Sequence, residues 1–452
     1  MEANNKNLKK IKILHIGNIA GNGYNNAKFL RRKGIESDLL IYNYTYAMGQ
    51  PEWEDAYFEE EVGLWKQDWN KINLHGFERP EWVYQYSSVP PKKIKLISHF
   101  KDILDMRKIT NKEFNLQFKK NNLISNIEIL KQKIGNNILQ ARSILKIVRS
   151  FRGLFFYINH IKEIIDRYDI IQAYGEDPII AMLACPDKPL VSFEHGTMRD
   201  TPLEKTLKGE LLKLAYQKSR KCIITNPDGI FSAKKIGLNN YVFIPHPVDT
   251  DKFFPKETYL RKELKRKTNL ELIFFAPARH DWEVKCNYKI IKAFNQYLKK
   301  SSLKTILIFS DWGEDLEKSK KYIKKLGIEK HIIWTYPLPK MKLAQYYNAS
   351  DLVIDQFRYG HFGTTSPEAM ACGKPVINQF DWEINKWAWQ EKPPIVPAES
   401  SFEIFKAMEQ LSKDKNLRQE LGKKGRNWME KHHNWELVAQ KQIDIYQEIL
   451  KT

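Results

Sequence analysis

Cysteine is scarce in this chain, and the spacing of the few cysteines excludes two common uses of the residue. The 452 residues include only four, at positions 185, 222, 286 and 372, and no two of them form a CxxC pair. Isolated thiols of this kind make neither a zinc-ligand set nor a disulfide framework. We therefore expect a protein that works in a reducing cytosol.

Long apolar runs are also missing. The N-terminus, MEANNKNLKK, is polar and leads straight into a strand-like run, and no apolar stretch approaches the roughly 18 residues that a membrane span requires. These features predict a cytoplasmic chain that is neither secreted nor integral to a membrane. Peripheral attachment to the inner face of the membrane stays open, and it depends on the distribution of charge.

Acidic residues are few relative to basic ones. The chain has 74 Lys and Arg residues against 54 Asp and Glu residues, which gives a net charge of +20. Such an excess favours anionic partners, such as nucleic acid, anionic lipid or phosphorylated substrates. The excess is local, because residues 91–160 contain 15 basic residues and only 4 acidic ones.

Residues 91–160 are expected to form a basic, mostly helical insertion within a first domain. Around residue 150, apolar and basic side chains alternate with helical periodicity on opposite faces. The basic face comprises Arg142, Lys146, Arg149 and Arg152. Two interpretations stay open: a helix packed on its own domain with a solvated basic face, or a platform for an anionic membrane surface or acceptor. No base-reading motif accompanies the charge, so we do not expect a nucleic-acid partner.

The rest of the chain alternates short apolar runs with helical stretches, which predicts parallel strands with crossover helices. A charged, Pro-containing connector at 249–269 divides this alternation into two sets. The sequence thus predicts an α/β fold with two doubly wound, Rossmann-like domains facing a cleft. We expect the domains over 1–260 and 265–425, followed by a C-terminal helix over 426–452. Ligands of such sheets bind at the carboxyl ends of the strands.

The segment GHFGTTSPEAMACGKPVI, residues 360–377, carries the strongest functional signal. Its small and hydroxyl residues stand where a strand opens into a helix, so free backbone N–H groups can hold phosphate. Glu368 follows one turn later, where a carboxylate can accept hydrogen bonds from both hydroxyls of a ribose. Taken alone, the glycines are explained by an ordinary tight turn, and Glu368 by the preference for an acidic residue at a helix N-terminus. Together in one segment, these features indicate a nucleotide-binding site more specifically than either does alone.

This segment resembles the signature of the retaining GT-B glycosyltransferases of family 4, E-G-F-G, four further residues, then E-A-M-A-x-G-x-P-V-I. The matching positions are Phe362, Gly363, Glu368, Ala369, Met370, Gly373 and Pro375. The family's first glutamate falls on Gly360, and the next residue is His361 instead of glycine. In the family that glutamate approaches the hydroxyls of the donor sugar, so the departure bears on sugar identity and on transfer itself.

The resemblance covers nearly the whole chain outside the insertion, and it implies further site residues. APARHDWEVKCNYKIIKAF resembles the segment whose arginine and lysine clamp the donor diphosphate, here Arg279 and Lys285. A guanidinium and an ammonium can neutralise the leaving diphosphate more strongly as the bond breaks. FEHGTMRD follows a strand where the family keeps a histidine near the donor sugar, which matches His195.

Donor-binding residues are expected in three other places. Gly21 and Gly23 belong to a loop that resembles the family's glycine loop, and its spacing is not GxGxxG, so no dinucleotide cofactor is expected. Trp312 and Tyr336 follow strands where family members hold the nucleotide base, and they either stack on it or serve packing. The expected donor site is completed by His361, Phe362, Gly363, Thr364 and Thr365.

The resemblance implies a hexosyltransferase-like enzyme that moves a sugar from a nucleoside diphosphate sugar to a hydroxyl acceptor, with retention. A glycan or lipid-linked acceptor and a role in polysaccharide or glycolipid biosynthesis are expected from the family and the basic insertion. The leaving phosphate oxygen can take the acceptor's proton, so neither a metal nor another cofactor is expected. The alternatives are a nucleotide-sugar epimerase or hydrolase on the same fold, and an inactive scaffold that binds glycan or membrane.

Overall fold

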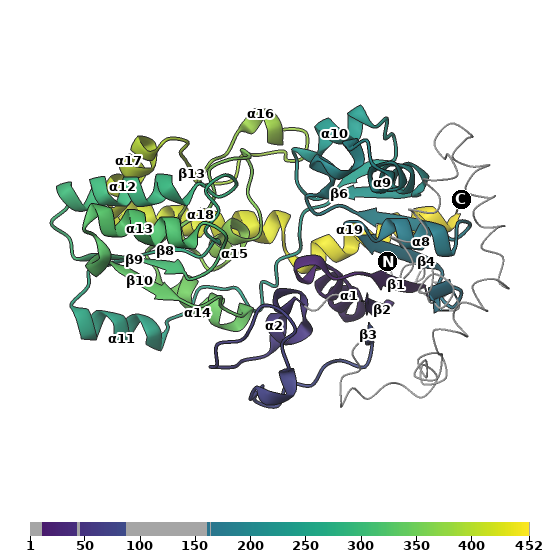
Figure 1. The fold of residues 1–452 in the computed structure, drawn as a ribbon, viewed down its shortest axis with the longest axis horizontal. Helices are drawn as coiled ribbons and strands as arrows, with labels where there is room; N and C mark the ends of the chain where they lie inside the picture. The colour runs from purple at the N-terminus through teal and green to yellow at the C-terminus, as the bar shows by residue number, and fades with distance from the viewer. Residues whose placement is uncertain (1–10, 43–45, 87–160, 163, 452) are drawn as a thin grey trace, which may run out of the picture.

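The computed structural model describes residues 11–42, 46–86, 161–162 and 164–451, which form two α/β domains (Figure 1). The strands of the first domain are β1 (Lys12–Ile16), β2 (Glu36–Tyr42), β3 (Val83–Tyr86), β4 (Ile170–Tyr174), β5 (Leu190–Phe193), β6 (Lys221–Ile224) and β7 (Tyr241–Phe243). Those of the second are β8 (Leu272–Ala276), β9 (Thr305–Ser310), β10 (Ile332–Thr335), β11 (Leu352–Ile354), β12 (Val376–Asn378) and β13 (Val396–Pro397).

Each domain contains one parallel sheet. The first sheet has seven strands in the order β3-β2-β1-β4-β5-β6-β7, and the second has six in the order β10-β9-β8-β11-β12-β13. The central strands are buried on both faces: every residue of β8 (LIFFA) and of β9 (TILIFS) is buried. Continuous apolar runs of this kind are typical of parallel sheets that carry helices on both sides.

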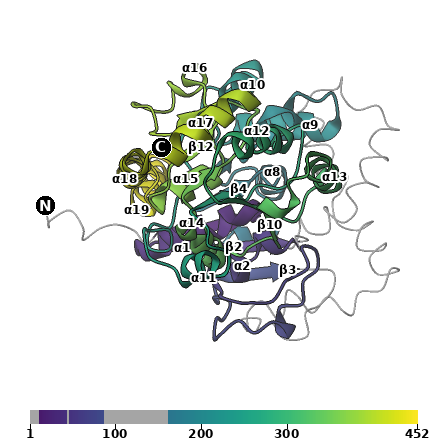
Figure 2. The ribbon, with the colours of Figure 1, turned by 90° about the vertical axis from the view of Figure 1, so that its left-hand side faces the viewer.

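Helices cover both faces of each sheet (Figures 1 and 2). In the first domain these are α1 (Asn22–Arg32), α2 (Pro51–Asp55), α8 (Pro178–Ala184), α9 (Leu207–Lys218) and α10 (Gly229–Lys235). In the second they are α11 (Tyr259–Thr268), α12 (Asn287–Lys300), α13 (Leu316–Leu326), α14 (Lys340–Ala349), α15 (Thr365–Ala371), α16 (Trp382–Asn385), α17 (Ser401–Lys413) and α18 (Lys415–His432). Alternate residues of β8 divide the core: Phe274 packs towards α12 and α17, and Phe275 towards α14 and α15.

The end of the chain returns to the first domain. The single helix expected over 426–452 is divided between α18 and α19 (Trp435–Lys451), because Val248 forms an isolated bridge with Asn434 at the break. Helix α19 then packs Val438 and Tyr446 against the core beside β1 and α1. The expected domain boundary at 260–265 falls within α11, which contacts α14 of the second domain.

The two doubly wound domains predicted from the sequence are therefore confirmed. The basic helical insertion expected at 91–160 lies outside the described residues, and so does every basic residue of its predicted platform. Among the residues that the structure does describe, no helix is both long and apolar enough to span a membrane.

Candidate active site

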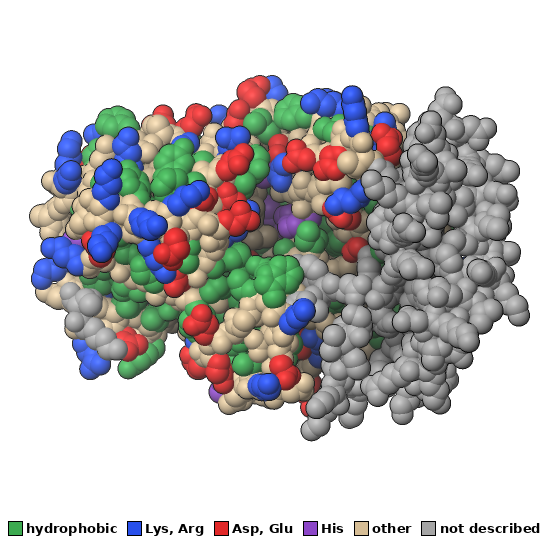
Figure 3. All heavy atoms as spheres, in the orientation of Figure 1, with side chains coloured by type: hydrophobic (Ala, Val, Ile, Leu, Met, Phe, Trp, Pro, Cys, Tyr) green, Lys and Arg blue, Asp and Glu red, His purple; other side chains and the backbone are tan. Residues whose placement is uncertain are grey.

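The contacts between the domains join loops that follow the carboxyl ends of strands. Arg199 after β5 contacts His361 after β11, and Trp387 donates to the carbonyl of Pro227 after β6. On this edge the strand order reverses between β1 and β4 and again between β8 and β11. Open α/β sheets bind ligands at such reversal points. Figure 3 shows a hollow between the domains in which histidine side chains are visible.

Arg279 and Lys285 lie on the loop that follows β8, at the reversal point of the second sheet. The Arg279 guanidinium donates to Asp281 Oδ2 at 2.8 Å, and its side chain is 41 % exposed. Asp281 also accepts the backbone N–H of Val284 at 2.8 Å, so the loop folds around one carboxylate. Arg279 is thereby oriented and still accessible to a ligand.

Lys285 is half-buried, and its ammonium donates to Gln356 Oε1 just after β11. Burial lowers the pKa of Lys285, and the positive charges of Arg279 and Arg199 act in the same direction. The nearby carboxylate of Asp355 opposes this shift. A partly buried ammonium that is close enough to two other cations to feel their charges favours the approach of an anionic group.

His280 stands between these residues and the core, and neither of its ring nitrogens has a hydrogen-bond partner among the described residues. The ring is fully buried against Phe309 and Trp334, and burial lowers its pKa to about 4. The backbone of His280 lies so close to Gly313 that a Cβ there would stand 2.3 Å from the carbonyl oxygen of His280.

We expect His280→Leu to raise the free energy of unfolding by about 1–2 kcal/mol at pH 7, because it removes buried polar atoms that have no partner. The gain should widen as the pH falls from 6.5 to about 4. In that range His280 binds a proton in the unfolded wild type but not in the folded wild type. The free energy of unfolding of the wild type therefore falls as the pH falls. Urea unfolding at several pH values measures the difference, and a gap that stays constant with pH would contradict it.

His195 follows β5 in the first domain, and Asn22 fixes its orientation. The Asn22 amide donates to His195 Nδ1 at 3.2 Å, and its oxygen accepts from His246 Nδ1 at 2.8 Å. Burial lowers the pKa of His195 to about 4, with contributions from Arg199 and Lys285. The imidazole is therefore neutral at pH 7, with its proton on Nε2.

Gly21 and Gly23 form the turn that brings Asn22 to this position. Gly21 caps α1 with a left-handed φ of 74°, and a Cβ there would stand 2.2 Å from Glu54 Oε1. A Cβ on Gly23 would stand 2.2 Å from the carbonyl oxygen of Gly17. Gly21 is favoured by its left-handed φ, and Gly23 by the backbone carbonyl of Gly17, which leaves no room for a side chain.

Arg199, Asp228 and His361 form an ion-pair cluster across the domain boundary. The Arg199 guanidinium donates to both oxygens of Asp228, at 2.6 and 3.1 Å, and lies 2.9 Å from His361 Nε2. His361 Nε2 is also 3.1 Å from Asp228 Oδ1. Burial alone would raise the pKa of Asp228, but the contacts with His361 and Arg199 outweigh it and lower the pKa.

Glu368 lies in α15 and is 6 % exposed. Its Oε1 accepts from the Lys340 ammonium at 2.5 Å, and its Oε2 accepts from the Tyr347 hydroxyl at 3.2 Å. Burial raises the pKa of Glu368, and the charge of Lys340 opposes that shift. Each carboxylate oxygen keeps a lone pair for a further donor.

Gly363, Thr364 and Thr365 lead into α15 beside this carboxylate. A Cβ on Gly363 would meet no heavy atom within 4 Å, so a ligand can approach the backbone there. Phe362 does not join them, because its side chain is 7 % exposed and stacks on Phe380 with ring centroids 5.6 Å apart. Its aromatic ring is part of the hydrophobic core.

The two aromatics expected beside the nucleotide base have different surroundings. The Tyr336 hydroxyl donates to the carbonyl of Glu59 at 2.8 Å, and the Lys342 ammonium lies 5.2 Å from the centre of its ring. Trp312 is half-buried, and its carbonyl accepts the backbone N–H of His280 at 2.8 Å. Tyr336 thus joins the two domains, and Trp312 holds the loop that carries Arg279.

Gly360, at the position where the family 4 signature has glutamate, has a backbone that favours glycine. Gly360 adopts a left-handed φ of 68°, and a Cβ there would lie 3.1 Å from Asp381 Cβ and 3.2 Å from Ile384 Cδ1. A side chain at this position would therefore be directed towards α16 and the turn before it. In this backbone, a glutamate side chain at position 360 would be directed towards α16 and could not extend towards a donor sugar.

Gly360→Glu is accordingly expected to lower the free energy of unfolding by about 1–3 kcal/mol without increasing activity, because the left-handed backbone disfavours any side chain. Thermal unfolding and initial rates on one preparation measure both effects. Gly34→Glu is the control, since Gly34 has a φ of 83° with no heavy atom near its Cβ position, so it isolates the backbone cost. An increase in activity for Gly360→Glu would contradict the interpretation that the backbone at this position requires glycine.

Four residues of this site were missed by the sequence analysis: Asn22, Arg199, Asp228 and Lys340. Each lies in or beside a segment that follows a strand, and Arg199 stands within the FEHGTMRD motif itself. That position was the available signal. Among the described residues, no group of three His, Cys, Asp or Glu side chains is arranged to hold a metal ion.

In a comparison with known families, residues 256–428 match the family Glycosyl transferases group 1. The match covers nearly all of the second domain, with Arg279, Lys285 and Glu368. An uncharacterized glycosyltransferase of Methanocaldococcus jannaschii is 24 % identical over 60 % of this chain and 71 % of its own length. Residues 256–428 thus resemble a group 1 glycosyltransferase domain, which supports a role in glycosyl transfer.

Solved structures resemble the whole chain. Sucrose-phosphate synthase from Thermosynechococcus elongatus aligns with a TM-score of 0.61 at 13 % identity, over 97 % of this chain and 99 % of its own. Anabaena HepE in complex with UDP and glucose aligns with a TM-score of 0.64 at 12 % identity, over 97 % and 100 %. HepE was also solved with UDP-glucose. At these identities the likeness establishes the fold, which is GT-B.

Proposed function

We propose that this protein transfers a sugar from a nucleoside diphosphate sugar to a hydroxyl acceptor in the cleft between its domains, with retention at the anomeric carbon. The observation that carries the proposal is the position of Arg279 and Lys285 at the reversal point of the second sheet. Lys285 also lies close enough to His195 of the first domain for its charge to lower the pKa of the imidazole. In the proposal, the two cations of the second domain and the histidine of the first domain therefore contact the same substrate in the cleft.

In the proposed reaction, the bond between the anomeric carbon and the phosphate oxygen breaks, and the diphosphate leaves with the electron pair. The acceptor oxygen bonds to the same face of the anomeric carbon, and its proton passes to the leaving phosphate oxygen. Negative charge develops on the diphosphate as the bond breaks, so Arg279 and Lys285 bind the transition state more strongly than the ground state. These two cations supply the charge, so the proposal requires no resident metal.

His195 acts in the proposal as a hydrogen-bond donor to the sugar. Asn22 donates to Nδ1, which leaves the proton on Nε2. A pKa of about 4 keeps this ring neutral through the physiological range, so it orients a sugar hydroxyl without adding charge. Glu368 would bind the ribose hydroxyls through its remaining lone pairs, and the backbone at 363–365 would contact the diphosphate.

A uridine nucleotide is the first donor to test, because the HepE structures contain UDP and UDP-glucose. For the acceptor we propose a glycan. Trp65 is 68 % exposed and packs against Tyr46, with ring centroids 4.6 Å apart and ring planes tilted by 50°, and the charge of Arg279 acts on the Tyr46 hydroxyl. An exposed indole near the diphosphate cations offers an apolar face to a sugar ring. Peripheral membrane attachment and a role in polysaccharide biosynthesis belong to the same proposal.

The function is tested with a panel of nucleoside diphosphate sugars, first by thermal shift and then by NMR of each stabilising donor with candidate glycan acceptors. We expect a stabilising donor and a product with the donor's anomeric configuration. Product without an acceptor would indicate a hydrolase or epimerase, and the absence of any binding would indicate a scaffold. Either result overturns the proposal.

A further inference from the structure

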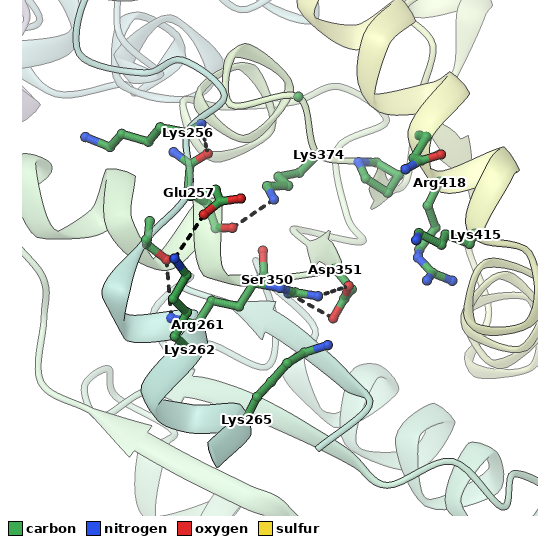
Figure 4. A pocket seen from close by; sticks show the side chains of 15 residues that line it. Lys256, Glu257, Arg261, Lys262, Lys265, Ser350, Asp351, Lys374, Lys415 and Arg418 are labelled. Atoms are coloured by element: carbon green, nitrogen blue, oxygen red, sulfur yellow. Dashed lines mark hydrogen bonds and ion pairs between the residues drawn. The ribbon is translucent and has the colours of Figure 1, made fainter. Parts of the chain in front are cut away.

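A second cavity lies on the outer side of the second domain, at the opposite edge of its sheet from the cleft. Its walls come from α11, from the turns that precede β11 and β12, and from the start of α18 (Figure 4). Asp351 stands just before β11 and Lys374 just before β12, so both mark the amino ends of these strands. The cavity has a volume of about 490 Å³, which is within the usual size range of ligand pockets.

Basic side chains dominate the lining. Seven of the fifteen lining residues are Lys or Arg, and only two are acidic. Both carboxylates are already paired: Asp351 with Arg261 at 2.7 Å, and Glu257 with Lys262 at 3.1 Å. The remaining lining cations are Lys256, Lys265, Lys374, Lys415 and Arg418. Within the described part of the chain, no carboxylate forms an ion pair with any of these five.

In Figure 4, Lys374 lies between Lys256 and Lys415, and Lys265 lies on another side of the cavity. Lys374 is half-buried, and its ammonium donates to the carbonyl of Asn348 at 2.9 Å. Burial lowers the pKa of Lys374, and the neighbouring Arg261 adds to the shift. Partly buried cations without anionic partners are costly unless a ligand compensates them.

We propose that this cavity binds a phosphoryl group or pyrophosphoryl group of an anionic ligand, at a site separate from the catalytic cleft. The cations converge from three segments that are distant in the sequence, around residues 256–265, 374 and 415–418. Ammonium and guanidinium groups around a hollow match the several oxygens of a phosphoryl group. The volume leaves room for more than one phosphoryl group. The proposal stands whether or not the cleft transfers a sugar.

The test is calorimetric titration of the full chain with inorganic pyrophosphate at about 0.15 M ionic strength, where exposed charges are largely screened. The double variant Lys265→Gln/Lys415→Gln is expected to bind at least about tenfold more weakly, because it loses charge-assisted hydrogen bonds. Lys374→Gln is a second, single-site variant. Lys285→Met in the cleft is expected to retain this binding, which separates the cavity from the diphosphate site.

A matched control removes two lysines elsewhere on the same domain. Lys321 and Lys325 lie on α13, are exposed and do not line the cavity, so Lys321→Gln/Lys325→Gln makes the same change in net charge. If this control weakens pyrophosphate binding as much as the cavity variant does, the binding is nonspecific and the proposal fails. It also fails if wild type does not bind, or if Lys285→Met alone abolishes binding.

The source of the phosphoryl group is identified with vesicles of phosphatidylcholine, with and without phosphatidic acid. Flotation that requires phosphatidic acid, is displaced by pyrophosphate and is lost in Lys265→Gln/Lys415→Gln supports the site and assigns it to a lipid headgroup. Pyrophosphate binding without flotation supports the site and assigns it to a free phosphorylated ligand.

Discussion

Replacing Lys285 by methionine is expected to lower kcat by about 1,000-fold, while the chain keeps its fold. Removing one preorganised donor to a developing anion costs about 100- to 1,000-fold in other enzymes, and Lys285 supplies a full charge as well as a donor. Stability should change little, because burial already disfavours the charged form and methionine replaces the stem of similar length. Initial rates at saturating donor measure the loss, and circular dichroism verifies the fold.

The control for this prediction is Lys292→Met, at an exposed position of α12, the helix that follows the loop carrying Lys285. It removes the same charge from the same domain and should retain wild-type kcat. Retention of more than a tenth of the wild-type kcat in Lys285→Met would contradict the role of Lys285 at the diphosphate.

The pH profile of the wild type provides a second readout of Lys285. Its pKa is lowered, so the ammonium loses its proton at a lower pH than an ordinary lysine, whose pKa is 10.5. Activity should therefore decline on the alkaline side as this proton leaves. In Lys285→Arg the guanidinium stays charged throughout, so whatever activity it retains should lack that alkaline decline.

The parts of the fold that were predictable from sequence are those that depend on neighbouring residues. Buried runs such as LIFFA in β8 are long enough to identify a parallel strand, and their alternation with helices predicts two doubly wound sheets. Arg279 and Lys285 could be predicted together because they are close in one motif, and their role at the diphosphate stays a prediction. Residues that belong to one strand–loop–helix unit leave a local signal.

Contacts between distant segments left no such signal. Arg199 and His361 are 162 positions apart, and Asn22 and His246 are 224 apart, yet each pair lies within hydrogen-bond range. The first pair depends on how the two domains pack, and the second on how two distant loops of the first domain pack. The burial of Phe362 similarly depends on α18, which supplies Trp428 to the same aromatic core. A motif gives the position of a residue in the chain, and tertiary packing decides whether its side chain faces ligand or core.

Glu368→Ala is expected to have the largest combined effect on donor binding and stability. It removes the carboxylate proposed to hold the ribose, which should weaken nucleotide binding by about 10- to 100-fold. It also leaves the Lys340 ammonium buried without its partner, which costs about 3–5 kcal/mol in comparable buried pairs. A single variant confounds these two effects, because a destabilised site also binds weakly.

A double-mutant cycle with Lys340→Met separates them. Glu368→Ala/Lys340→Met has no unpaired charge, so most of the lost stability should return, as measured by urea unfolding. Affinity for UDP, measured by calorimetry, should stay low because the acceptor of the ribose hydrogen bonds is still missing. Glu420→Ala, which breaks the exposed pair with Lys424 on α18, controls for loss of a carboxylate. If the double variant binds UDP as wild type does, Glu368 serves only to compensate Lys340, and the ribose must be held by other groups.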